Sequence, residues 1–267
     1  MLYILKILKK FFSTKRYLYF LPRNLRFKIF NIKALKLYKT LTGNYYLPRF
    51  AFKDLIRNEI IDNKIFDSQI YNTGKHYIKD NTIVLDVGSN FGQLSVLFSK
   101  YKNNVEVYSF EASRYIFTIL EKNIKINRAN VKLFNNLVGN QTEQDCFIEK
   151  ANLRKFNTYG SNKIEILEDN IKQNYSVEKI KTLKLDDIYF DKKISLMKID
   201  VQGHDLAVLK GARRLISEQK MPIIFEYEKD YEKDFKYSFK DFEIFINEIN
   251  YFIKIKIDNS NYLILPK

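Results

Sequence analysis

Residues 82–92 constrain the fold of this 267-residue chain more than any other stretch. The apolar run Ile83–Val87 is typical of a short parallel strand that is buried on both faces. Gly88 and Gly92 follow, and apolar residues then recur at helical spacing from Leu94 onward. The order of strand, glycine turn and helix predicts the start of a βαβ unit. A glycine at this turn lets the backbone approach a ligand closely, because it has no Cβ and tolerates positive φ.

The spacing of the two glycines narrows the class of ligand. The pattern Asp86-x-Gly88-x-x-x-Gly92 matches neither the dinucleotide fingerprint nor the phosphate loop with its Lys-Ser/Thr. It fits a looser loop that packs against an adenosine ligand without phosphates. The next predicted strand ends at Glu111, 19 residues past Gly92, close to the spacing expected of an acid that binds ribose hydroxyls. The alternative is an ordinary tight turn with Glu111 in solvent.

Composition places the chain among globular proteins of the cytoplasm. Hydrophobic residues make up 46% of the sequence, and a chain of this length can bury a sizeable core. Cys146 is the only cysteine, which excludes an internal disulfide and disfavours a four-ligand zinc site.

Positive charge is concentrated at the N-terminus. The net charge is +15, yet residues 1–53 hold 13 Lys or Arg and no acid precedes Asp54. Residues 2–12 predict an amphipathic helix with lysines on one side. We therefore expect a basic, amphipathic and helical N-terminal extension over residues 1–44, followed by a catalytic domain over 45–267.

We expect residues 1–40 to contact an anionic membrane surface. A helix packed on the domain and a nucleic-acid arm are the alternatives, although no nucleic-acid motif is present. Apolar runs are too short to span a bilayer, and lysines interrupt any signal-peptide core. The predicted location is thus cytoplasmic, or peripheral on the inner membrane face.

A second informative stretch begins with the apolar strand Ile194–Ile199. Asp200 lies at its carboxyl end, Gly203 turns the chain, and a helix follows. Ligands of open α/β sheets bind beyond the carboxyl ends of the strands, so Asp86, Glu111 and Asp200 should face one crevice. Further strands are predicted at 131–134, 222–226, 251–257 and 262–265, the last two as an antiparallel pair.

Residues 196–212, with the sequence LMKIDVQGHDLAVLKGA, carry a family resemblance. They are similar to the pattern K-I-D-V-E-G-x-E-x-x-V-L-x-G-A of FkbM-type methyltransferases, and residues 182–187 are similar to the T-L-D-D element of that family. The chain differs at Gln202 and Asp205, where the family has Glu. The resemblance runs from Asp67 to Pro266.

The resemblance implies a Rossmann-like class I fold with a mostly parallel seven-stranded sheet and an antiparallel C-terminal strand pair. It also implies S-adenosyl-L-methionine as cofactor and a hydroxyl acceptor, often on a sugar, so we expect a saccharide or glycolipid-type acceptor. Glu111 would hold the ribose of the cofactor. The residues that would hold its methionine end are Asp86, Gly88, Ser89, Asn90 and Gly92.

Methyl transfer to a hydroxyl needs a base, and two candidates follow the second strand. Asp200 is either this base or a cap for the next helix. His204 is either the base or a residue at the helix start whose ring bonds a neighbouring carbonyl. Asp200, Gln202 and Asp205 together offer oxygen ligands for a divalent cation, as a lesser alternative. An RNA methyltransferase and a non-catalytic binding module on the same fold are the other functional alternatives.

Overall fold

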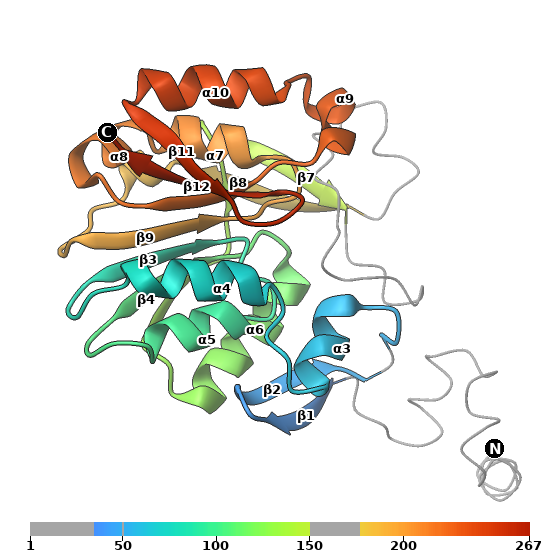
Figure 1. Ribbon diagram of the computed structural model, residues 1–267. Coiled ribbons are helices and arrows are strands. Elements are labelled where there is room, and N and C mark those ends of the chain that lie inside the picture. The colour runs from blue at the N-terminus through green and yellow to red at the C-terminus, as the bar shows by residue number, and fades with distance from the viewer. Residues whose placement is uncertain (1–34, 50, 150–176) are drawn as a thin grey trace, which may run out of the picture.

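The computed structural model describes residues 35–49, 51–149 and 177–267 (Figure 1). The predicted N-terminal helix at residues 2–12 lies outside the described residues.

A seven-stranded sheet forms the centre of the protein, in the order β11-β12-β10-β9-β3-β4-β5. Its strands are β3 (Ile83–Val87), β4 (Glu106–Phe110), β5 (Val131–Phe134), β9 (Ile194–Ile199), β10 (Ile223–Glu226), β11 (Tyr251–Lys256) and β12 (Asn261–Pro266). Pairs from β5 to β10 are parallel, whereas β12 is antiparallel to both β10 and β11. This arrangement confirms the Rossmann-like α/β fold and the antiparallel C-terminal pair that the sequence predicts.

Helices cover both faces of this sheet, in two groups that Figure 1 shows on opposite sides. One group is α4 (Ser68–Gly74), α5 (Gln93–Ser99) and α6 (Arg114–Asn127); the other is α7 (Asp205–Gly211), α8 (Arg213–Gln219) and α10 (Phe239–Glu248). Alternate residues of a strand point to opposite faces. Val84 therefore packs with the first group, and Leu85 packs with the second.

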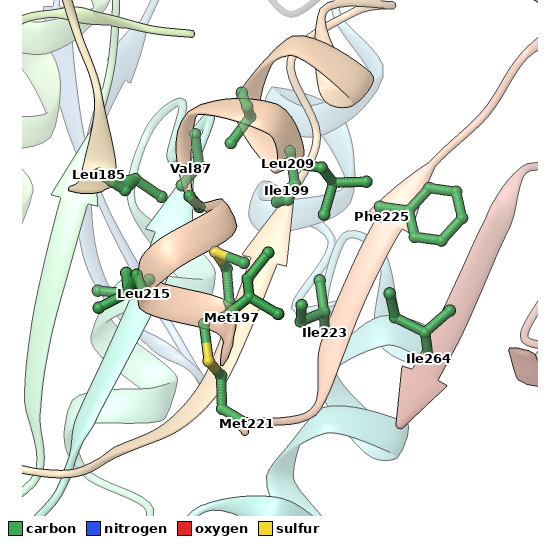
Figure 2. Packing of buried hydrophobic residues seen from close by; sticks show 14 of the residues in the cluster. Val87, Leu185, Met197, Ile199, Leu209, Leu215, Met221, Ile223, Phe225 and Ile264 are labelled. Carbon is green, nitrogen blue, oxygen red and sulfur yellow. The ribbon is translucent and has the colours of Figure 1, made fainter. Parts of the chain in front are cut away.

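The core on the α7 and α8 side is apolar and continuous. Figure 2 shows Met197 and Ile199 of β9 beside Ile223 of β10, with Leu209 and Leu215 packed over them. All of these side chains are 3% exposed or less. Such a core holds the carboxyl ends of neighbouring strands in fixed relative positions, which a site built across several strands needs.

A hairpin of β1 (Leu35–Thr40) and β2 (Gly43–Pro48) packs against α6. Asn127 accepts from the Asn44 N–H at 2.9 Å and donates to the Asn44 carbonyl at 2.6 Å. Asn123 does the same for Tyr46, at 2.6 and 3.3 Å. These two helix side chains thus bind the β2 backbone as a neighbouring strand would. The predicted boundary at residue 44 falls inside β2, so residues 35–44 belong to this packed hairpin and are not a helical extension.

Two smaller groups of elements complete the described chain. Helix α3 (Leu55–Ile61) follows the hairpin, and a three-stranded sheet is formed by β6 (Leu137–Val138), β7 (Asp145–Glu149) and β8 (Val177–Leu183) in the order β6-β8-β7. The remaining elements are the short helices η2 (Lys75–Tyr77), η3 (Leu185–Asp187), η4 (Lys229–Tyr231) and α9 (Glu232–Phe235). In the described part of the chain, no helix combines the length and the apolar character that crossing a bilayer requires.

Candidate active site

A cavity of about 360 Å³ lies at the carboxyl ends of β3, β4, β9 and β10. Its volume falls within the range of about 300–1,000 Å³ typical of small-molecule sites. Six of the residues predicted for the site line it: Asp86, Gly88, Ser89, Asn90, Glu111 and Asp200. Gly92 and His204 are not among the lining residues.

The loop after β3 is held closely against the ends of its two neighbouring strands. The Gly88 N–H donates to the Phe110 carbonyl at 2.9 Å, and the Asp200 N–H donates to the Val87 carbonyl at 3.0 Å. Gly88 has φ +81°, and a Cβ there would come within 1.8 Å of the Asp200 carbonyl oxygen. Position 88 therefore requires glycine for both backbone conformation and space.

Gly92 supports the loop from outside the cavity. It precedes α5 with φ +83°, and its N–H donates to the Ser89 carbonyl at 2.9 Å. A Cβ at Gly92 would lie 2.4 Å from Cδ1 of Leu120 in α6. The second glycine of the motif thus allows the close approach of α5 and α6, and it does not line the cavity.

Glu111 is partly buried and hydrogen-bonded. Its Oε2 accepts from the Asn90 N–H at 3.0 Å and its Oε1 accepts from the Ser113 N–H at 2.8 Å. Burial raises the pKa of Glu111 to about 7, although these two N–H groups act in the opposite direction. The loop after β3 and the end of β4 are therefore joined through one carboxylate that also lines the cavity.

Asp86 lies beneath the loop in a buried polar network. Its side chain is 0% exposed, and its Oδ2 accepts from Ser95 Oγ at 2.5 Å, which in turn accepts from Ser109 Oγ at 2.7 Å. Its Oδ1 lies 3.4 Å from the Nζ of Lys198. Asp86 is thus held by a hydrogen bond on one carboxylate oxygen and by an ion pair on the other.

Lys198 is a functional candidate that the sequence analysis did not single out. It is 3% exposed, donates to the Gly88 carbonyl at 2.9 Å, and lies 3.5 Å from Oδ2 of Asp200. Burial alone would lower the pKa of Lys198, but the carboxylates of Asp200 and Asp86 raise it above its ordinary value. The signal in the sequence was a lysine inside a buried six-residue strand whose other residues, apart from Ser195, are apolar.

Besides Asp54, which caps α3, three further acids line the cavity without having been predicted as site residues. Asp67 precedes α4 in the left-handed conformation, with φ +55°. Glu226 ends β10, and Glu228 follows two residues later. The position of Glu226 at a strand end is visible in the sequence, whereas the approach of Asp67 to the sheet comes only from tertiary packing.

His204 lies apart from the residues with which it was predicted. It is 9% exposed and lines a second, smaller cavity with Gly139, Cys146 and Thr182. Its ring centroid is 5.8 Å from that of Phe235, and burial lowers the pKa of His204 to about 4. The neutral imidazole of His204 therefore lies in a different cavity from Asp200 and the loop after β3.

The side chains considered as ligands for a divalent cation contact other groups of the protein. Gln202 accepts from the Tyr231 hydroxyl at 2.8 Å, and Asp205 accepts from the Glu226 N–H at 3.2 Å. Asp205 is 0% exposed. Among the residues that the structure describes, no group of three or more His, Cys, Asp or Glu is arranged to hold a metal ion.

The parallel sheet with its reversed β12, the glycine loop and the acid at the end of β4 define a Rossmann-like methyltransferase. The model of the family described as "Methyltransferase FkbM domain" matches residues 86–253, which is more than half of the chain. The chain therefore belongs to this family of S-adenosylmethionine-dependent methyltransferases. A comparison with curated proteins found no match.

Solved structures of methyltransferases are similar to this chain. The FkbM methyltransferase of Methylobacillus flagellatus KT is 20% identical with a TM-score of 0.45, over 69% of this chain and 43% of that chain. A TehB-like methyltransferase of Corynebacterium glutamicum is 8% identical with a TM-score of 0.46, over 79% of this chain and 93% of that chain. The chain thus spans less than half of the Methylobacillus protein.

The residues around the cavity fit S-adenosylmethionine. Near Glu111 the lining includes the apolar side chains of Leu137 and Ile148, which suit an adenine ring. Glu111 retains acceptor capacity beyond its two backbone N–H partners, which suits ribose hydroxyls. The absence of a side chain at Gly88 leaves backbone exposed to the cavity at the centre of the site.

Cofactor affinity should depend on pH through Glu111. Ribose hydroxyls donate to the carboxylate form, so we expect the Kd to be constant above about pH 8 and to rise by up to about tenfold per pH unit below the folded-state pKa of about 7. Glu111→Gln should weaken binding and remove this dependence. Calorimetry of S-adenosylmethionine binding from pH 6 to pH 9 measures both. Glu121→Gln on the exposed side of α6 is the control, and a wild-type Kd that is flat across this range would contradict the role of Glu111.

Lys198→Met should strongly destabilise the fold. It leaves the carboxylates of Asp86 and Asp200 without their buried cation, which typically costs about 3–5 kcal/mol in unfolding free energy. Lys132→Met is the control, because Lys132 also pairs with a carboxylate from a strand but is 49% exposed, and should cost at most about 1 kcal/mol.

Urea denaturation followed by circular dichroism measures these free energies. The double variant Lys198→Met with Asp86→Asn should recover part of the loss, because one of the unpaired charges is then removed. Equal destabilisation by the two single lysine variants would show that the buried ion pairs contribute no more to the free energy of unfolding than the exposed one.

Proposed function

We propose that this protein transfers the methyl group of S-adenosylmethionine to a hydroxyl of a saccharide or glycolipid-type acceptor. The observation that carries this proposal is Asp200, which lines the cavity next to the glycine loop and is 19% exposed. Its carboxylate is thus open to a ligand and is held from behind by Lys198. The hydroxyl and the saccharide come from the family resemblance of residues 196–212.

The cofactor would bind along the loop after β3. Ser89 and Asn90 would face its methionine end together with the backbone at Gly88, and Glu111 would accept from its ribose. Asp86 would act from beneath, by holding the loop through Ser95 and Lys198. When bound, S-adenosylmethionine supplies an electrophilic methyl group on a sulfonium.

Asp200 is our proposed general base. It would orient the acceptor hydroxyl by accepting its hydrogen bond and would take the proton as the oxygen becomes a nucleophile. Lys198 is a positioning residue in this proposal, because it fixes the carboxylate from the buried side. The location of His204 in the second cavity disfavours the imidazole as the base.

Charge on the cavity wall supports a small acceptor over RNA. Asp200 and Glu228 line the cavity, and carboxylates repel the phosphates of a polyanion. A non-catalytic binding module would keep cofactor binding but would not need an open carboxylate beside the glycine loop.

Asp200→Asn should lower kcat by about 10²–10⁴-fold, because a general base contributes by that order. The Kd for S-adenosylmethionine should stay within about twofold, since the cofactor-side contacts remain. His204→Asn should retain activity. Release of S-adenosylhomocysteine in the presence of a saccharide panel measures turnover. Wild-type turnover by Asp200→Asn would remove Asp200 as the base, and cofactor binding without turnover of any acceptor would favour a binding module.

We further propose, from charge alone, that residues 1–40 bring the enzyme to an anionic membrane surface on the cytoplasmic side. Vesicles with phosphatidylglycerol should bind the full chain at low salt and release it at high salt, because each surface lysine contributes about 1 kcal/mol at most. Lys6, Lys9 and Lys10 changed together to Gln should weaken this binding. The same change at Lys122, Lys125 and Lys220 is the control. Equal binding to neutral phosphatidylcholine vesicles would contradict the proposal.

A further inference from the structure

The acceptor end of the cavity holds more carboxyl groups than the described lysines and arginines pair with. Three lining carboxylates already have partners: Asp54 caps α3, Asp86 faces Lys198, and Glu111 binds backbone N–H groups. Asp200 shares Lys198 with Asp86, and three further lining carboxyls remain: Asp67, Glu226 and Glu228. Within the described part of the chain, Lys198 is the only Lys or Arg that lines this cavity.

These three carboxyls and that of Asp200 are close enough to act on one another. Burial raises the pKa of Glu226 to about 10 and that of Asp67 to about 7, and the next largest cause for each is the charge of Asp200. Glu226 is therefore protonated at pH 7 in the empty cavity, and a cation bound beside it would lower its pKa and favour the carboxylate. Burial and Asp200 also raise the pKa of Glu228. The carboxyl group of Asp200 therefore lies at the electrostatic centre of an acidic wall.

Sheet register brings acceptor atoms together at one place on this wall. Glu226 of β10 pairs directly with Asn261 of β12, so their side chains emerge on the same face. Glu228 follows Glu226 by two residues and lines the same cavity. Three side chains with oxygen acceptors are thus presented at the ends of two adjacent strands.

Two of these acceptors have no partner among the described residues. Asn261 is 6% exposed, and its amide nitrogen is held by Asp258 at 3.0 and 3.1 Å, but its Oδ1 has no hydrogen bond. Oε2 of Glu226 is likewise buried without a hydrogen bond. Buried oxygens without donors carry a desolvation cost of about 1–3 kcal/mol each, which a ligand with matching donors removes.

The cofactor supplies too little positive charge to satisfy this wall. Its sulfonium and ammonium groups outnumber its single carboxylate by one, whereas three lining carboxyls, those of Asp67, Glu226 and Glu228, form no ion pair with a described Lys or Arg. A protonated amine has three donors and no acceptor, which matches a site made of oxygen acceptors. A metal ion is a poorer match, because the described His, Cys, Asp and Glu residues form no metal-binding trio.

We propose that the acceptor is a saccharide with a protonated amine near the hydroxyl that is methylated, and that Glu226, Glu228 and Asn261 bind this amine. The inference rests on the proposed function, since it places the amine beside the hydroxyl that Asp200 would deprotonate. It narrows the acceptor to amino sugars and excludes acidic sugars, whose carboxylates this wall repels.

The test uses three sugars that differ in charge: glucosamine, glucose and glucuronic acid. Each is titrated into the full chain saturated with S-adenosylhomocysteine at pH 7.0, and binding is followed by calorimetry or ligand-observed NMR. Glucosamine should bind at least about tenfold more tightly than glucose. Glucuronic acid should bind more weakly than glucose.

Matched variants test whether the acidic wall causes the preference for glucosamine over glucose. Glu226→Gln and Glu228→Gln should each reduce the ratio of glucosamine to glucose affinity by about threefold or more. Asp230→Asn, an exposed acid outside the cavity lining, removes the same charge and should leave the ratio unchanged. A ratio that is unaffected by both Glu variants would overturn the assignment.

The outcomes separate this inference from the proposed function. Equal binding of glucose and glucosamine by wild type overturns the inference and leaves a saccharide acceptor in place. Failure of all three sugars to bind, with S-adenosylhomocysteine bound in the same sample, overturns the saccharide acceptor and the inference together. Failure to bind S-adenosylhomocysteine would instead remove the cofactor site as assigned.

Discussion

The buried ammonium of Lys198 is the interaction on which the rest of the site depends. It lies between the carboxylates of Asp86 and Asp200, and it donates to the Gly88 carbonyl. The strands β3 and β9, which are adjacent in the sheet but more than 100 residues apart in the chain, are thereby joined at their carboxyl ends. Because a buried charge without a partner is costly, the three groups require one another. The glycine loop and the carboxylate of Asp200 are consequently held in a fixed position relative to each other.

The two halves of the cavity are built in different ways. On the cofactor side, backbone groups predominate: Gly88 must be glycine, and Glu111 is held by two N–H groups from the loops after β3 and β4. On the other side, acidic side chains from separate elements converge around Asp200. A backbone cradle suits a ligand that does not vary, whereas a wall of side chains can differ between members of a family. We therefore propose that this acidic wall selects the acceptor.

Packing far from the sheet also shapes the cavity. Gln93, at the start of α5, accepts from the Phe66 N–H at 2.9 Å and donates to the Lys64 carbonyl at 2.8 Å. These bonds fix the segment between α3 and α4, from which Asp67 reaches the cavity. Asn123 and Asn127 hold the hairpin that precedes α3. The N-terminal part of the described chain is thus one wall of the site.

The sequence by itself determined the central sheet, the loop after β3 and the acids at the ends of β4 and β9. Those features depend on local patterns: apolar runs, glycines at turns and charges at strand ends. Glu111 and Asp200 were predicted as lining residues for this reason, because parallel strands bring their carboxyl ends to one edge. The β1–β2 hairpin was not predicted, since Lys36 and Lys39 continue the basic and apolar composition of the preceding residues and the partner helix α6 lies about 80 residues away.

Only the tertiary structure decided which charged groups meet. Lys198 is marked in the sequence only as a charge inside a buried strand, and Asp67 carries no local mark of a site. The partners of Lys198 follow from distances across the sheet, and the place of Asp67 follows from tertiary packing. His204 shows the converse, because its position five residues after the end of β9 suggested the cavity, whereas the turn at Gln202 and Gly203 directs it elsewhere. Sequence spacing reports distance along the chain, but the energies of charges and hydrogen bonds depend on distance in space and on burial.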